Sequence, residues 1–196
     1  MSEDCAALHP CPWAKGEDYL AYHDNEWGVP SYDRNHLFEK LCLEGQQAGL
    51  SWITVLRKRE HYRRCFHRFV PESVARMRDA TLEKLLTDSG LIRNRLKIYG
   101  IRKNAKALLA LEKELHQQGS DFAQFIWQFV GGQPQLNHFH SMADVPAQTA
   151  AAQTMSKALK KAGFTFVGPT ICYAFMQSMG LVNDHLTSCP QHPDNK

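Results

Sequence analysis

A histidine and a cysteine lie four residues apart near the C-terminal end of the sequence, in the segment NDHLTSC at 183–189. In a helical turn, His185 and Cys189 would point in the same direction and could hold one side of a metal ion. A closed structural zinc site needs four nitrogen or sulfur ligands. The N-terminal segment supplies the remaining candidates: Cys5, His9, Cys11 and His23. A shared zinc would staple the two ends of the chain together, whereas the alternative is a set of reactive side chains on a frayed tail.

Glu44 carries a carboxylate on an otherwise apolar helical stripe, three residues after Leu41 and on the same face as Leu37. A buried carboxylate is costly unless a cation or hydrogen-bond donors compensate for the lost water. Such an acid usually lies at a helix end and turns to solvent. Here Gly45 and Gly49 flank it and permit the close approach of another chain or a ligand, so Glu44 is also a candidate binding group.

Aromatic residues accompany this acid in the sequence. Trp52 follows it by about two helical turns, and an N-terminal cluster contains Trp13, Tyr19, Tyr22 and Trp27. These side chains could form an ordinary core. An acid among aromatic rings is also what a pocket for a flat cationic ring requires, because the ring faces attract a cation and the carboxylate supplies the opposite charge.

The elements that must position these residues are mostly helical, because apolar residues recur at helical spacing and no segment alternates with period two. The main predicted helices span 37–48, 52–66, 95–118, 149–162 and 169–180. Ser51 is the expected N-cap of the second of these. Thr81 should cap a short helix that Gly90 ends, and Ser120 should cap another. Residues 131–146 resemble a crossover between two helical lobes, so an all-α fold is expected.

The last two predicted helices are joined by GFTFVG at 163–168. Gly163 suits the left-handed position after a helix, and Pro169 suits the first turn of the next helix. A tight connection of this kind aims backbone N–H groups outward, where they can bind a phosphate through Gly168 and its neighbours. The segment is therefore a helix–hairpin–helix candidate for DNA binding, although ordinary helix–helix turns are more common.

Basic residues occur in three groups. They are RKREHYRR at 57–64, RNRLK at 93–97 with Arg102, Lys103 and Lys106, and Lys157, Lys160 and Lys161 just before the hairpin. Each group alone would be a solvated helix face. Together, and beside a hairpin that can bind phosphate, they make nucleic acid the leading partner.

The composition limits the class of protein. A chain of 196 residues that is 43% hydrophobic can bury one core, so a single domain over 1–196 is expected. The net charge of +3 favours no partner by itself. No run approaches the roughly 18 apolar residues of a membrane span, and no apolar signal-peptide core opens the sequence, so a cytoplasmic protein is expected. Its six cysteines should then be reduced, which favours metal ligands over disulfides.

Four segments resemble the 3-methyladenine DNA glycosylase I family of bacterial enzymes. They are AYHDNEWGVP (21–30), LFEKLCLEGQQAGLSWITVLRKRE (37–60), FVGPTICYAFMQ (166–177) and GLVNDH (180–185). The resemblance runs from about residue 11 to residue 189, and its LEGQQAGLSW segment is highly specific. It implies an α-helical helix–hairpin–helix fold, a zinc ion that ties the termini together, and an enzyme that excises 3-methyladenine from alkylated double-stranded DNA.

The resemblance also selects the metal ligands. It assigns a structural zinc to Cys11, His23, His185 and Cys189. Cys5 and His9 then belong to an N-terminal extension over 1–10, and residues 190–196 are expected to form a tail. No open coordination position is implied for catalysis.

In the same way, Glu44 matches the family's essential base-binding acid, which makes it the expected catalytic residue. The base-binding aromatic residues would be Trp13, Tyr19, Tyr22 and Trp52, although the spacer between the first two is one residue shorter than the family pattern. Leu50 matches a residue that enters the space left by a flipped nucleotide. Asp184 lies near the catalytic aspartate of the wider superfamily, but the family does not use it, so a structural role is expected.

The expected reaction is hydrolysis alone, because no lysine falls at a pocket position where it could form a Schiff base and cut the strand. A single compact domain that acts on DNA is expected to be a monomer. The alternative is a non-catalytic, zinc-stapled helix–hairpin–helix DNA-binding protein. Glu44 distinguishes the two, because a protein that only binds phosphates gains nothing from an acid in its apolar stripe.

Overall fold

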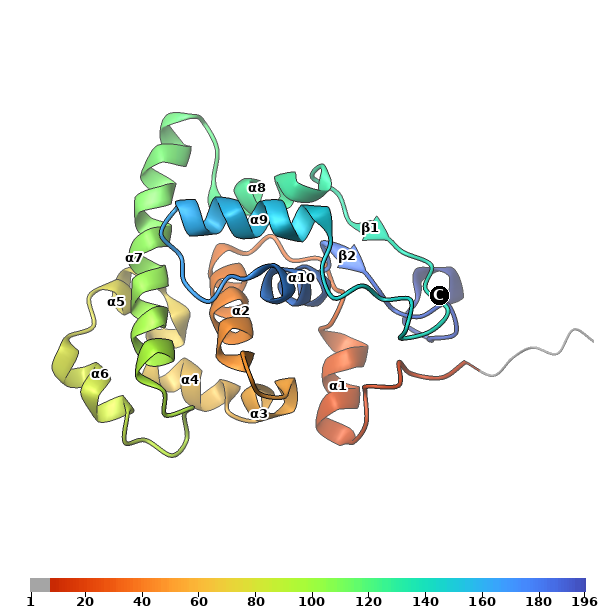
Figure 1. The fold of residues 1–196 in the computed structure, drawn as a ribbon, viewed down its shortest axis with the longest axis horizontal. Coiled ribbons are helices and arrows are strands. Elements are labelled where there is room, and N and C mark those ends of the chain that lie inside the picture. Colours follow the sequence, from red (N-terminus) through yellow and green to blue (C-terminus); the bar gives the residue numbers. More distant parts are fainter. Residues whose placement is uncertain (1–7) are drawn as a thin grey trace, which may run out of the picture.

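Two helices from opposite ends of the chain, α2 (Arg34–Gln47) and α10 (Pro169–Ser178), pack against each other at the centre of the molecule (Figure 1). The structure is a computed structural model that describes residues 8–196. The other helices are α1 (Glu17–Asn25), α3 (Trp52–Leu56), α4 (Arg59–Cys65), α5 (Pro71–Ala75), α6 (Asp79–Leu85), α7 (Arg95–Gln117), α8 (Phe122–Trp127) and α9 (Ala150–Lys161). Short 3-10 turns are η1 (His67–Phe69), η2 (Gln128–Val130) and η3 (Pro193–Asn195).

The described residues contain very little sheet. Strands β1 (Gln135–Leu136) and β2 (Val182–Asn183) are two residues long and pair in parallel. They join the long connection before α9 to the segment that follows α10. The expected all-α character is therefore confirmed, and this small ladder ties the C-terminal segment to the rest of the molecule.

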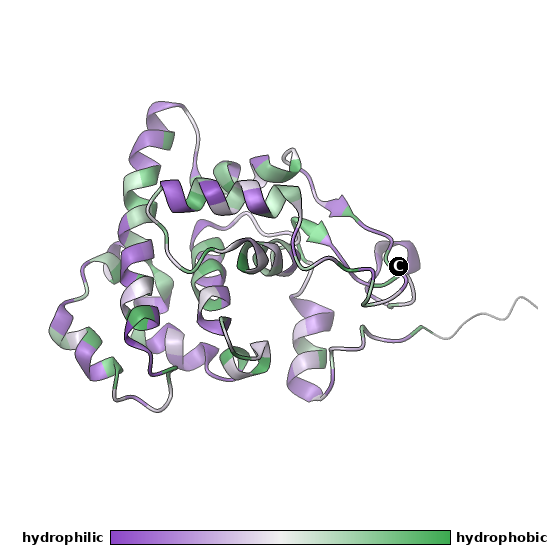
Figure 2. Ribbon diagram, in the orientation of Figure 1, coloured by the Kyte–Doolittle hydropathy of each residue, from purple (hydrophilic) through white to green (hydrophobic). Residues whose placement is uncertain are grey.

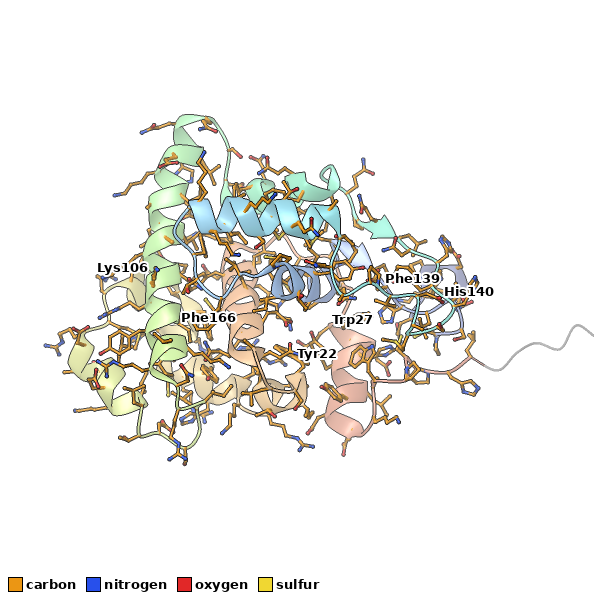
Figure 3. All side chains as sticks on the ribbon, viewed as in Figure 1. Tyr22, Trp27, Lys106, Phe139, His140 and Phe166 are labelled. Carbon is orange, nitrogen blue, oxygen red and sulfur yellow. The ribbon has the colours of Figure 1, made fainter. Side chains whose placement is uncertain are left out.

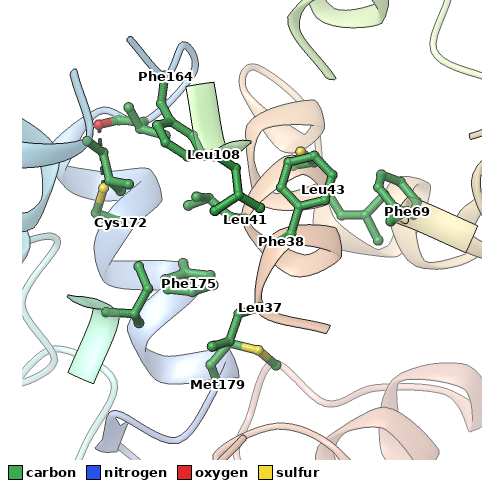
Figure 4. Close-up of a cluster of buried hydrophobic side chains, with 14 of the residues drawn as sticks. Leu37, Phe38, Leu41, Leu43, Phe69, Leu108, Phe164, Cys172, Phe175 and Met179 are labelled. Carbon is green, nitrogen blue, oxygen red and sulfur yellow. Dashed lines mark hydrogen bonds between the residues drawn. The ribbon is translucent and has the colours of Figure 1, made fainter. Parts of the chain in front are cut away.

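The interface of α2 and α10 is the centre of the hydrophobic core (Figure 4). Leu37, Phe38 and Leu41 of α2 are fully buried. Leu37 and Leu41 face Phe175 of α10 and Met179 just beyond it, whereas the Phe38 ring points the other way, with its centre 6.3 Å from that of Phe69. The Asp33 side chain caps α2 by accepting a hydrogen bond from the His36 N–H at 2.7 Å. A capped apolar stripe thus holds the end of α2, where Glu44 lies, at a fixed place in the fold.

Helix α7 flanks this core and is amphipathic, with apolar and polar residues alternating around it (Figure 2). Ile98, Ile101, Ala105 and Leu108 are buried on its inner face. Asn94 caps the helix by accepting from the Lys97 N–H at 3.1 Å. The helix predicted over 95–118 is confirmed with an error of one residue.

Other predicted boundaries are wrong. The helix expected over 52–66 is two helices, because Lys58 N–H bonds to Val55 O at 3.0 Å and closes α3 before α4 begins. Thr81 lies inside α6, which starts two residues earlier, at Asp79, where an acid suits the positive end of the helix dipole. This helix also ends at Leu85, before Gly90.

The predicted N-cap of α8 is also wrong by one residue. Asp121, not Ser120, is the N-cap: its side chain accepts from the Gln124 N–H at 2.8 Å, and the Gln124 side chain accepts from the Asp121 N–H at 3.2 Å. This reciprocal capping box satisfies two backbone donors, which a cap at Ser120 would not do.

The two ends of the chain lie side by side. His9 N–H bonds to Ser188 O at 2.9 Å, and Figure 1 shows the C-terminus beside the N-terminal segment. The expected tail over 190–196 is not loose, because His192 is fully buried and its Nε2 lies 3.2 Å from Asn137 O. Cys5 lies outside the described residues. None of the described helices is long and apolar enough to cross a membrane.

Candidate active site and metal cluster

A pocket of about 360 Å³ opens between α1, α2, α3 and α10. The N-terminal segment and α1 contribute aromatic rings, including Tyr22, which is labelled with the nearby Trp27 in Figure 3. The main lining residues are Trp13, Tyr19, Tyr22, Trp27, Glu44, Trp52, Gln177 and Asp184. The structure thus brings the predicted acid and all four predicted base-binding aromatics to one cavity.

Glu44 lies in the last turn of α2 with its side chain only 4% exposed. Its Oε1 is 2.8 Å from Nζ of Lys40, one turn earlier on the same helix. The cost of burying the carboxylate is therefore offset by a buried cation. No lysine was expected at the pocket. The four-residue spacing nevertheless places Lys40 on the same face of α2 as Glu44, directly behind the cavity wall.

The aromatic rings surround the cavity at angles to one another. The rings of Tyr22 and Trp52 are 5.6 Å apart between centres, with an interplanar angle of 43°. Trp13 meets Trp27 edge-on at 5.1 Å. The Tyr19 hydroxyl accepts a hydrogen bond from the Ile53 N–H at 2.9 Å, which anchors this ring at the start of α3 despite its shorter spacer. Flat apolar faces and the Glu44 carboxylate therefore meet in a single space.

Leu50 lies at the edge of the pocket region and is 43% exposed. It follows Gly49, whose φ of +76° produces a sharp turn after α2. A smaller cavity of about 190 Å³ connects this turn with Glu44 and with Ala174 of α10. An exposed apolar side chain therefore stands beside the acid of the main pocket.

The connection between α9 and α10 is a tight turn closed by backbone hydrogen bonds. Gly163 has φ +94° and donates to Lys160 O at 3.0 Å, while Phe164 N–H donates to Leu159 O at 3.0 Å. These two bonds form a Schellman motif, as the glycine predicted. Gly168 is the N-cap of α10, and a Cβ placed on it would meet no atom within 4 Å among residues 8–196, apart from its neighbours in the chain.

The tip of this hairpin packs against two helices. Phe166, labelled in Figure 3, has φ +57° and lies against glycines of α2 and α7. A Cβ on Gly45 would be 2.9 Å from Phe166 Cβ, and one on Gly100 would be 3.2 Å from Phe166 Cδ2. The close approach predicted at Gly45 therefore exists, but the approaching group is the protein's own hairpin. Lys106 of α7 borders the groove beside it.

Four buried side chains from the two ends of the chain form a metal-binding arrangement: Cys11, His23, His185 and Cys189. His23 Nε2 lies 3.2 Å from His185 Nδ1 and 3.4 Å from Cys189 Sγ. Cys189 Sγ is 3.5 Å from His185 Nδ1, and Cys11 Sγ is 3.8 Å from the same nitrogen. Tetrahedral zinc, with bonds of about 2.0–2.1 Å to nitrogen and 2.3 Å to sulfur, would place its ligand atoms about 3.3–3.8 Å apart. The donor set fits.

The surroundings of this cluster suit metal ligation. His23 Nδ1 bonds to Asp24 Oδ1 at 2.7 Å, and His185 Nε2 lies 3.1 Å from Trp27 O, so the outer nitrogen of each ring is oriented by an acceptor. The neighbouring Cys11 thiol, followed by His185 and His23, lowers the pKa of the Cys189 thiol. The side chain of His9, a candidate from sequence, lies outside this cluster.

Two further pocket residues are Trp27, to which the sequence assigned no role of its own, and Asp184, for which a structural role was expected. Trp27 lines the cavity and packs edge-on against His185 at 4.7 Å, so it links the pocket to the cluster; its place in the N-terminal aromatic group was the available signal. Asp184 also lines the pocket. Its oxygens accept from Asn137 at 2.7 Å, Tyr173 at 2.6 Å and Gln177 at 2.8 Å, which supports a structural role.

Comparisons with known proteins extend over nearly the whole chain. The model of the Methyladenine glycosylase family matches residues 13–192. DNA-3-methyladenine glycosylase 1 of Escherichia coli (strain K12) is 54% identical over 190 residues, which cover 96% of this chain and 100% of that protein. A crystal structure of 3-methyladenine DNA glycosylase I shows 54% identity and a TM-score of 0.89, covering 94% of this chain and 100% of that one. The Staphylococcus aureus enzyme, in a structure addressing 3-methyladenine recognition, shows 36% identity, a TM-score of 0.90 and coverages of 95% and 98%.

Proposed function

Because this chain belongs to the methyladenine glycosylase family, we propose that it excises 3-methyladenine from alkylated double-stranded DNA by hydrolysing the bond between base and sugar. The observation that carries the proposal is a buried carboxylate, Glu44, at the wall of an aromatic pocket. A DNA-binding scaffold without catalysis has no use for this arrangement. We expect the enzyme to act as a cytoplasmic monomer.

Recognition of the base begins with its removal from the stack, which costs a few kcal/mol and is easiest for a damaged or poorly paired nucleotide. Methylation at N3 makes the adenine ring cationic. Glu44 accepts hydrogen bonds from the edge of the flipped base, while Trp52, Trp13 and Tyr22 offer π surfaces to the positive ring. A neutral adenine gains less from the same groups, which gives the pocket its selectivity for the damaged base.

The bond to be broken is already weak, because a cationic base is a good leaving group. The enzyme therefore needs little acid catalysis. Water attacks the oxocarbenium-like sugar, whose charge is stabilised by the DNA phosphates and the field of the site. Lys40 does not line the cavity, so its amine, charged or neutral, is not placed to attack the sugar in Schiff-base chemistry. Hydrolysis without strand cleavage is the expected reaction.

DNA binding is assigned to the hairpin between α9 and α10. As a helix–hairpin–helix motif, it would present Gly168 and the first N–H groups of α10 to a phosphate. Lys103 and Lys106 of the neighbouring α7, which border the groove beside the hairpin, would add salt-sensitive contacts. Exposed Leu50 would enter the gap that the flipped nucleotide leaves. These contacts would place the extruded base over the pocket mouth.

The cluster of Cys11, His23, His185 and Cys189 would hold a structural zinc ion, which when bound supplies a cross-link between the ends of the chain. Its donor set supports this assignment, and all four positions are occupied by protein side chains. Trp27 packs on His185, and the ring centre of Trp13 lies 5.3 Å from that of His23. Fixing the two histidines would therefore also fix two walls of the pocket.

The proposal is tested by chromatography of the bases that the purified protein releases from methylated duplex DNA. We expect 3-methyladenine in the supernatant and 7-methylguanine left in the DNA. Glu44→Gln should abolish release while DNA binding changes little. Trapping with borohydride should give no covalent protein–DNA adduct. Folded, zinc-loaded protein that binds DNA and releases no base would favour the non-catalytic scaffold instead.

A further inference from the structure

Lys40 is as deeply buried as the acid that it contacts. Its Nζ lies 2.8 Å from Glu44 Oε1, and both side chains are 4% exposed. Apart from this ion pair, the ammonium group has no hydrogen-bond partner within residues 8–196. The pocket therefore has a poorly solvated cation of its own beside the carboxylate that is proposed to bind the base.

The same ammonium group lies against two of the pocket rings. Nζ is 3.3 Å from the ring centre of Trp52 and 4.8 Å from that of Tyr22, distances at which an aromatic face attracts a cation. Glu44, Trp52 and Tyr22 are also the groups to which the cationic base is proposed to bind. In the free protein, these three groups already surround the positive charge of the Lys40 ammonium.

We propose that Lys40 competes with the cationic base for Glu44 and the two rings, so that binding of the base is coupled to the loss of one proton from Lys40 to solvent. The inference rests on the proposed function and makes Lys40 a residue that sets the charge selectivity of the pocket. Two cations beside one buried carboxylate repel each other. An amine relieves this repulsion by becoming neutral, which a guanidinium cannot do. No bond of the base is made or broken in this step.

Lys40 can lose its proton close to neutral pH, as such a coupling requires. Burial lowers the pKa of Lys40 from its ordinary value of 10.5 to about 8, while Glu44 acts to raise it. A base that takes over the Glu44 carboxylate removes this favourable influence, so the ammonium loses its proton more readily. By linkage, losing the proton first must strengthen base binding by the same factor.

The other titratable groups near Lys40 keep their charge between about pH 7 and pH 9. Burial lowers the pKa of His36 on α2 and raises that of Tyr22 on α1 well above 10. Burial acts to raise the pKa of Glu26, but Arg59 of α4 bonds to this carboxylate at 2.8 Å and holds its pKa low. An arginine itself stays protonated. A pH dependence of base binding in this range therefore reports on Lys40.

The test uses 3,9-dimethyladeninium, in which a methyl group replaces the sugar and the ring keeps its positive charge, with neutral 9-methyladenine as the matched ligand. Calorimetric titration of the complete protein in two buffers of different ionisation enthalpy gives the affinity and the number of protons released. We expect the cation to bind about tenfold more tightly at about pH 9 than at pH 7. A proton should be released at neutral pH, and the affinity for the neutral ligand should not change.

Two substitutions at Lys40 should move the affinity in opposite directions. Lys40→Met removes the competing charge and should bind the cation tightly at every pH, without proton release. Lys40→Arg keeps a charge that cannot be lost and should bind weakly at every pH. Arg63→Met is the matched control. It removes a cation of α4 that pairs at 2.7 Å with Glu39, the residue next to Lys40 on α2, and it should keep the wild-type pH dependence.

The outcomes separate this inference from the proposed function. The KM for release of 3-methyladenine from methylated DNA gives the same comparison of pH values and variants in the complete reaction. If the wild type binds the cation or releases the base with no proton coupling, or if Lys40→Met keeps the wild-type pH dependence, the inference about Lys40 is wrong and the proposed function stands. If the wild type neither binds the cation nor releases 3-methyladenine, the proposed function fails, and the inference fails with it.

Discussion

Asn104 of α7 bonds to the backbone of Thr165 through both ends of its side-chain amide. Its Nδ2 donates to the Thr165 carbonyl at 3.1 Å, and its Oδ1 accepts from the Thr165 N–H at 2.8 Å. Asn104 is 3% exposed, so water cannot easily replace either bond. Helix α7 therefore fixes the shape of the turn that leads into α10.

Replacing Asn104 with alanine should loosen the hairpin. Two backbone groups of Thr165 lose their partner, so the free energy of unfolding should fall by about 1–3 kcal/mol. Affinity for duplex DNA should fall too, because the hairpin N–H groups are no longer held in position. Denaturant unfolding and DNA titration at fixed salt measure the two effects. Asn25→Ala is the control, since this exposed amide bonds to Ala21 O one turn away and to no other side chain or backbone group within residues 8–196; equal DNA affinity for both variants would contradict the prediction.

Gly45→Ala should disturb the same hairpin from the side of α2. The new Cβ would lie 2.9 Å from Phe166 Cβ and 3.2 Å from its carbonyl oxygen, so the turn must move. Overpacking of this kind typically costs about 1–3 kcal/mol. Thermal unfolding should show the loss of stability, together with weaker DNA binding.

The matched control is the same substitution at Gly168. There the backbone has an ordinary φ of −63°, and in the described part of the chain no atom beyond the two adjacent residues lies within 4 Å of the new Cβ, so stability should change by only about 0.5 kcal/mol. DNA affinity should nevertheless fall, because the methyl group projects where a phosphate is proposed to bind. A Gly168→Ala variant with full affinity would remove this residue from the DNA interface.

The sequence allowed accurate prediction where apolar spacing or a glycine gave a strong local signal, although the predicted caps of α6 and α8 were wrong. The stripes of α2 and α7 and the glycine after α9 follow from spacing and capping within one element. The break between α3 and α4 did not follow, because nothing in the pattern at Lys58 marks the short-range bond to Val55. Helix α1 was not predicted, and only its aromatic residues were identified, because its buried face consists of little more than Tyr22 and His23.

The site was predictable to the extent that its parts are neighbours in sequence. His185 and Cys189 were paired from their spacing on the premise of a helical turn, but the structure joins them through an irregular turn instead. The choice of Cys11 and His23 came from the family resemblance. Contacts between residues more than 150 positions apart leave no periodic signal. Lys40 and Glu44 had the spacing of an ion pair from the start. The spacing could not reveal that both side chains turn inward, because that depends on the rings of Trp52 and Tyr22 packed over them.

Removal of the metal should destabilise the fold and weaken the pocket. Metal analysis of the purified protein should find about one zinc per chain. Cys189→Ser should lose the zinc, lower the melting temperature, and reduce base release because His23 and His185 no longer hold Trp13 and Trp27 in place. Cys65→Ser is the control, since Cys65 lies in a separate, half-exposed group with His61 and Asp88, and it should retain the metal. A metal-free wild type, or a Cys189→Ser variant of unchanged stability, would refute the zinc assignment.

The buried charge of Lys40 should make stability depend on pH in a defined direction. Its pKa is about 8 in the folded protein and 10.5 when unperturbed, so between these values the unfolded chain binds more protons than the folded one. The free energy of unfolding therefore rises with pH across this window, by up to about 3 kcal/mol. Lys40→Met lacks this contribution, and the advantage of the wild type over the variant should grow from about pH 8 to pH 10. Denaturant unfolding of both proteins at each pH measures the difference, in which the titration of all shared groups cancels. A constant difference would mean that Lys40 loses its proton at the same pH in the folded and unfolded chains.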